Sequence, residues 1–103
     1  MRHKIYPAAR RRLIEIWRYT DEAWGEAQAD AYVRGIHAAI EAAAGKPTSW
    51  RPVEHPQLRD IFFVRRGKHF IFFRQLRDGA LGVVSILHER MKLPDRLTDD
   101  LND

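Results

Sequence analysis

The chain has 103 residues, with 18 Lys and Arg against 14 Asp and Glu, 45% hydrophobic residues and no cysteine. This length gives a single domain over residues 1–103, without room for separate cofactor and substrate domains, and the missing cysteines exclude a disulfide scaffold and thiolate metal sites. The basic surplus, with a pI near 9.9, suits an acidic partner, either a nucleic acid or an acidic protein segment, and equally suits an ordinary solubilised surface.

The N-terminal segment predicts a short strand and no secretion signal. Residues 1–6 lead from charged side chains into a proline without the apolar segment of a signal peptide. No apolar run along the chain approaches the roughly 20 residues of a membrane span. We therefore expect a cytoplasmic protein that makes no membrane contact, with residues 3–6 forming a strand.

Two amphipathic helices are predicted after this strand. In residues 7–24 apolar side chains recur every three or four positions, and the proline at the first position suits a helix start because its missing N–H would be unpaired there. Gly25 ends this pattern. Residues 26–44 repeat it in an alanine-rich segment that stops at Gly45. The pattern predicts a helical hairpin followed by a proline-containing loop over residues 46–58.

The remainder of the chain has the composition of β-strands. Residues 61–64 and 70–73 are aromatic and β-branched runs, and residues 65–68 between them suit a hairpin turn. The Asp-Gly pair at 78–79 predicts a second hairpin, which leads into a strand at residues 83–87. The predicted fold class is α+β: an N-terminal strand, a two-helix hairpin and then a three-stranded antiparallel meander.

These strands are apolar on both faces. Neighbouring side chains of a strand point to opposite faces, yet both members of the pairs 62–63, 72–73 and 83–84 are apolar. One helical hairpin covers one face, so we expect the other to expose an apolar patch rimmed with Arg, which usually marks a binding surface. The alternative is that the tail, the long loop or a second copy of the chain covers it. The polar tail, residues 89–103, is expected to fray after at most one short helical turn.

Catalytic and metal-binding patterns are weak. The five histidines lack metal-ligand spacing, and His88-Glu89 begins like a zinc-protease motif but has Lys92 where the second histidine is required. We therefore expect that the protein binds no metal or cofactor and is not an enzyme. The alternative is an RNase site in which His88 acts as general acid or base beside the basic residues Arg65 and Lys68.

Several short motifs occur in an order that carries a family resemblance. They are Pro7-Ala8-Ala9, Leu13–Ile16, Gly25, Gln28-Ala29, Tyr32, Pro47, Leu58-Arg59, His69–Arg74 and Ile86–Met91. Over roughly residues 3–97 the chain resembles the ParE branch of the RelE/ParE superfamily of toxin–antitoxin toxins. The last motif is the most specific, because it looks like the closing leucine-histidine-x-arginine-methionine signature of that family.

The resemblance implies a toxin of a type II toxin–antitoxin system. Its expected partner is a ParD-like antitoxin, a DNA-binding dimer whose C-terminal region wraps the toxin in a hetero-oligomer, so that the toxin reaches DNA only through the antitoxin. DNA gyrase is the expected target. The alternative is a ribosome-dependent mRNA endonuclease of the RelE type, but no tyrosine follows Tyr32 to supply the tyrosine of that branch. Two positions depart from the family pattern. Tyr6 stands where a Ser or Thr usually precedes the proline of the first helix, and Phe73 stands where a tyrosine is common.

Strand parity gives two candidate faces for the antitoxin. One holds Val83, Ser85 and Leu87, and the other Val84, Ile86 and His88. Because Ser85 is the polar break in an apolar run, we assign its face to the partner. The neighbouring strands are expected to add Ile61, Phe63, Arg65, Phe72 and Arg74. Phe72→Ala is expected to weaken binding more than Arg74→Ala, because a buried Phe contributes about 1.5–3 kcal/mol and an exposed ion pair at most about 1 kcal/mol.

Overall fold

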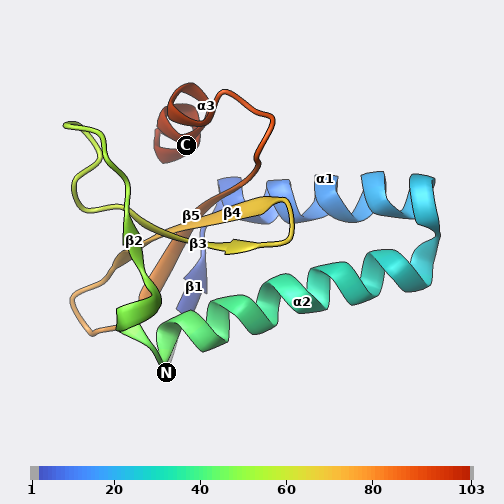
Figure 1. The fold of residues 1–103 in the computed structure, drawn as a ribbon, viewed down its shortest axis with the longest axis horizontal. Helices are drawn as coiled ribbons and strands as arrows, with labels where there is room; N and C mark the ends of the chain where they lie inside the picture. The colour runs from blue at the N-terminus through green and yellow to red at the C-terminus, as the bar shows by residue number, and fades with distance from the viewer. Residues whose placement is uncertain (1–2, 103) are drawn as a thin grey trace.

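A five-stranded sheet in the order β1-β5-β4-β3-β2 lies between two helical layers of unequal size (Figure 1). The computed structural model describes residues 3–102. The elements in chain order are β1 (His3–Ile5), α1 (Pro7–Trp24), α2 (Glu26–Ala44), the 3₁₀ turn η1 (Pro47–Ser49), β2 (Arg51–Pro52), β3 (Phe62–Arg66), β4 (His69–Gln75), β5 (Leu81–His88) and α3 (Leu93–Leu101). The predicted α+β class is confirmed, with one more strand than expected.

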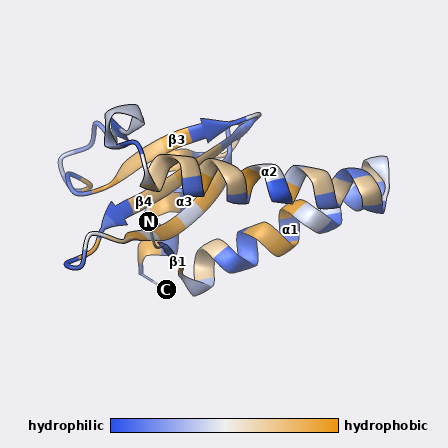
Figure 2. Cartoon of the chain, turned by 90° about the horizontal axis from the view of Figure 1, so that it is seen from below, coloured by the Kyte–Doolittle hydropathy of each residue, from blue (hydrophilic) through white to orange (hydrophobic). Residues whose placement is uncertain are grey.

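The helical hairpin forms at the positions that the sequence indicates. α1 begins at Pro7, and Tyr6 makes no side-chain capping bond there, as its departure from Ser or Thr predicts. Gly25 joins α1 to α2 with φ 93°, a left-handed value that favours glycine. In Figure 2 both helices alternate between hydrophobic and hydrophilic segments, whereas the strands are mostly hydrophobic. The hairpin therefore lays one apolar side on the sheet.

The face under the hairpin holds the larger of two hydrophobic cores. Leu13 of α1 and Ile36 and Ile40 of α2 pack there against Ile71 and Phe73 of β4. Trp50 seals the edge of this core, because its indole N–H donates to the Ala43 carbonyl at 2.7 Å while its ring meets the Phe73 ring edge-on. We call this side of the sheet the hairpin face.

A β-bulge in β5 changes the predicted parity of that strand. Phe72 pairs with Ser85 but Phe73 pairs with Val83, so Val84 is the extra residue. Ser85 therefore lies on the face opposite the hairpin, as assigned, while Val83 belongs to the core of the hairpin face. The prediction that Val83 shares a face with Ser85 was wrong, because strict alternation does not hold across a bulge.

The C-terminal tail does not fray as the sequence suggested. Residues 93–101 form α3, which lies across the sheet from the hairpin (Figure 1). Leu97 of α3 is 1% exposed and belongs to a second core with Phe72, Val84 and Leu87. The expectation of a wholly uncovered second face was wrong, because the tail covers most of it, as the alternative states. We call this side the α3 face.

Gly67 offers a test of how the β3–β4 turn meets α2. Its φ is 58°, and a Cβ atom added there would lie 2.8 Å from the Tyr32 hydroxyl. Gly79 has φ 83° but nothing within 4 Å of the same atom. Replacing either glycine with alanine costs roughly 1–2 kcal/mol for the left-handed backbone, and only Gly67→Ala adds a steric conflict. We expect urea unfolding to show a larger stability loss for Gly67→Ala than for Gly79→Ala; equal losses would contradict the packing of Tyr32 against the turn.

Candidate functional site

The α3 face contains most of the residues that the sequence assigned to a binding surface, but they are covered. Ile61, Ser85 and Leu87 are each 0% exposed and Phe72 is 4% exposed. Phe63 is half-buried and packs its ring against Phe72 at 5.9 Å between centroids. Apart from Val83, the predicted apolar residues and Ser85 therefore do gather on one face, and they pack in the same core as Leu97 of α3 or beside it.

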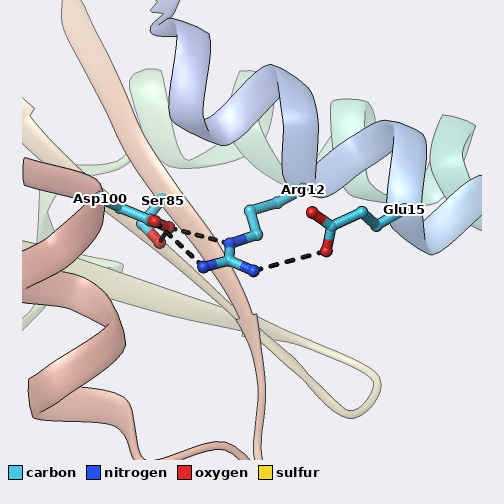
Figure 3. Close-up of polar contacts among 4 residues, drawn as sticks. All are labelled: Arg12, Glu15, Ser85 and Asp100. Atoms are coloured by element: carbon cyan, nitrogen blue, oxygen red, sulfur yellow. Dashed lines mark hydrogen bonds and ion pairs between the residues drawn. The ribbon is translucent and has the colours of Figure 1, made fainter. Parts of the chain in front are cut away.

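A polar cluster holds α3 in this position. The guanidinium of Arg12 on α1 donates through two nitrogens to the two carboxylate oxygens of Asp100, each at 3.0 Å (Figure 3). The Ser85 hydroxyl of β5 donates to the same carboxylate at 2.6 Å. Two-point pairing of an arginine with a carboxylate is the strongest common form of ion pair. One carboxylate thus joins α1, β5 and α3.

The neighbours of Arg12 favour the charged form of its guanidinium. Hydrogen bonding to Asp100 raises the pKa of Arg12, and Glu15, 3.4 Å from the third guanidinium nitrogen, acts in the same direction. The Asp100 side chain is only 8% exposed, so its pairing with Arg12 is shielded from solvent. Ser85, the polar break that the sequence singled out, satisfies its buried hydroxyl by donating to this carboxylate.

α3 leaves part of the apolar face open. A groove of about 190 Å³ lies between α3 and the loop that precedes β3. Its lining comprises Val53, Glu54, His55, Leu58, Phe63, Phe70, Phe72, Leu93, Pro94 and Leu97. Aromatic rings form its floor, since Phe63 and Phe70 meet edge-on at 5.5 Å between centroids. An apolar side chain is the kind of group that this groove suits.

The two arginines assigned to the rim are present there. The Arg65 guanidinium lies 5.3 Å from the Phe70 ring centroid and forms an ion pair with Glu89. Arg74 lies on β4 with its Nε 3.7 Å from the Asp60 carboxylate. Both are partly exposed, so each can meet an acidic group of a partner.

The alternative RNase residues come together at the β3–β4 end of the sheet. Glu89 forms an ion pair with Arg65, and its N–H donates to the Lys68 carbonyl at 2.9 Å. The neighbouring His88 accepts the Arg90 N–H on Nδ1 at 3.0 Å. Their positions thus also serve the hairpin end structurally.

A second histidine, which the sequence did not single out for chemistry, lies beside His88. The Tyr32 hydroxyl is 2.6 Å from Nδ1 of His69, whose ring meets the His88 ring edge-on at 5.1 Å. Burial, with a smaller contribution from the charge of His88, lowers the pKa of His69 to about 4. Burial also raises the pKa of Tyr32. Near neutral pH this pair is therefore an uncharged hydrogen-bonded contact between α2 and β4.

Within residues 3–102, no group of three His, Cys, Asp or Glu side chains is placed to hold a metal ion. None of the described helices has the length and apolar character needed to cross a membrane.

Sequence reasoning missed Arg12, Asp100 and Leu97. Arg12 lies in a run of three arginines that looks like an exposed basic surface, and the tail is polar enough to be expected to fray. One signal was available, because leucines recur at 93, 97 and 101, which is the spacing of one helix face.

Known proteins resemble this chain over most of its length. A family model described as the ParE toxin of the type II toxin–antitoxin system parDE matches residues 4–93. A curated relative, Toxin ParE1 of Mycobacterium tuberculosis H37Rv, is 36% identical over 98 residues, which cover 93% of this chain and 97% of the relative. Toxin ParE1 of Caulobacter vibrioides is 32% identical, and the match covers 86% of this chain and 90% of the relative. Toxin ParE of Escherichia coli is 34% identical, and the match covers 84% of this chain and 82% of the relative.

A solved structure shares the fold. It is described as the chromosomal ParDE TA system from P. aeruginosa, and it superposes with a TM-score of 0.71 at 18% identity, covering 85% of this chain and 95% of that one. At this identity the likeness concerns the fold alone.

The half-buried His69 gives a pH dependence of stability. Folding holds the pKa of His69 at about 4, below its ordinary 6.5, so the unfolded chain binds the proton more tightly between these values. Stability from this group is thus complete above pH 6.5 and is lost as the pH falls toward 4. We expect the melting temperature to drop across this window and the drop to shrink in His69→Gln.

His3→Gln is the matched control. His3 pairs with Leu81, at the far end of β5 from His88. An unchanged pH dependence in His69→Gln would contradict the assignment.

Proposed function

We propose that this chain, which belongs to the ParE toxin family of type II toxin–antitoxin systems, is neutralised by a ParD-like antitoxin and poisons DNA gyrase by binding it, without catalysing a reaction. The observation that carries the proposal is the match to toxins over nearly the whole chain, including the C-terminal Leu87-His88-Glu89-Arg90-Met91 motif. The relatives are named as toxins, and the match to this chain covers 97% of one and 90% of another.

The surface supports a protein partner on the α3 face. Its apolar floor continues from the second core into an open groove, and Arg65 and Arg74 stand at its rim. An antitoxin segment with apolar side chains and neighbouring carboxylates would fit both features. Apolar burial would supply most of the affinity, because partly exposed ion pairs contribute at most about 1 kcal/mol each.

A binding mechanism also agrees with the local roles of the RNase candidates. Arg65 is engaged with Glu89 and with the Gly67 carbonyl, at 2.8 Å from the latter. His88 accepts a backbone N–H that organises the chain leaving β5. These are the contacts of a structural turn, and the proposal needs no catalytic group among them.

The proposal is tested by expressing the chain from a tightly repressed promoter. We expect growth arrest with early induction of a DNA-damage reporter, while incorporation of labelled amino acids initially continues. The purified chain should inhibit supercoiling by DNA gyrase, and co-expression of the protein encoded by the adjoining reading frame should restore growth.

His88→Ala separates the two mechanisms. A gyrase poison should keep its toxicity in this variant, since His88 makes no catalytic contribution in that mechanism. Rapid ribosome-dependent cleavage of mRNA that disappears in His88→Ala would reverse the assignment in favour of the RelE-type endonuclease.

A further inference from the structure

α3 has the chemistry of a partner segment. It carries three aspartates against one arginine, in a chain whose overall formal charge is +4. Leu93, Leu97 and Leu101 form a single apolar stripe at intervals of four residues, and all three pack into the core of the α3 face. The chain thus covers an apolar surface rimmed by arginines with an acidic amphipathic helix of its own.

The helix itself is weakly built. It has nine residues, makes no side-chain N-cap bond and has no basic residue in its last turn. Asp99 and Asp100 instead stand near its C-terminal end, where the helix dipole disfavours negative charge. Helices this short are marginal in water without tertiary contacts. α3 is therefore helical because it is docked, and the Asp100 cluster with the leucine stripe supplies the docking.

The most deeply buried of the predicted binding residues cannot be reached while α3 is docked, although Arg65 and Arg74 at the rim can. Ser85 and Leu87 are 0% exposed and Phe72 is 4% exposed. The groove beside α3 admits an apolar side chain but not a segment that replaces the whole cover. A partner that uses these residues has to take the place of the helix.

We propose that α3 is a removable cover of this face, and that the antitoxin segment displacing it is acidic and amphipathic, with apolar side chains in the places of Leu93, Leu97 and Leu101 and a carboxylate in the place of Asp100. This inference rests on the proposed antitoxin partner. It adds that the antitoxin binds on the α3 face and that its segment replaces α3 there. The incoming carboxylate takes over the bonds of Arg12 and Ser85, so neither is left buried without a partner. Binding affinity then scales with the fraction of molecules in which α3 is undocked.

The first experiment is hydrogen exchange on the full chain, free and with the protein encoded by the adjoining reading frame. We expect the amides of residues 93–101 to be protected in the free chain and to exchange at least tenfold faster in the complex, while β5 stays protected. Absence of any complex would overturn the proposed function. A complex in which α3 keeps its protection would overturn this inference alone, as would an α3 that is already unprotected in the free chain.

The second experiment compares Asp100→Asn with Asp99→Asn. Both substitutions remove the same charge from the last turn of α3, but Asp99 is exposed, whereas Asp100 binds Arg12 and Ser85. If α3 must leave, loosening its attachment raises the undocked fraction, and we expect Asp100→Asn to bind the same antitoxin about tenfold more tightly than Asp99→Asn. Equal or weaker binding by Asp100→Asn would contradict the displacement of α3 by the antitoxin. The melting curve of this variant shows whether the rest of the domain stays folded.

Discussion

The sheet is apolar on both faces, and the rest of the structure follows from the need to cover both. The helical hairpin buries one face through Ile36, Ile40 and Leu13. The other face would expose Phe72, Val84 and Leu87 if the chain ended after β5. Because apolar area of this kind is costly in water, the last described helix belongs to the domain as a cover and is not an appendage.

The sequence predicted those elements whose signals are local. The spacing of apolar residues and the glycines at 25 and 45 determine the hairpin helices, and the Asp-Gly turn determines where β5 can begin. β2 and the bulge at Val84 were missed because they depend on pairing between strands, which leaves no local pattern. The face assignment therefore held for Ser85 and Leu87 beyond the bulge and failed for Val83 before it.

The sequence predicted most of the residues that share the α3 face, but it did not predict that a helix covers them. That Ile61, Phe63, Phe72, Ser85 and Leu87 gather on one face follows largely from alternation. That α3 covers this face depends on its leucine stripe and on an ion pair between residues 88 positions apart in the sequence. Arg12 in a basic run and Asp100 in an acidic tail each look like solvent-exposed charges when read alone, and only the folded chain brings them together.

The two covers differ in how much of the domain depends on them. α1 and α2 have 18 and 19 residues and fill the larger core, so removing either would expose much of that core to water. α3 has nine residues and contributes no strand to the sheet, so it can undock without breaking any strand pairing. A partner that competes with α3 opposes a short, weakly helical segment and one buried carboxylate, whereas a partner that competes with the hairpin opposes the stability of the whole fold. The α3 face is therefore the side on which a reversible exchange of covers costs the least.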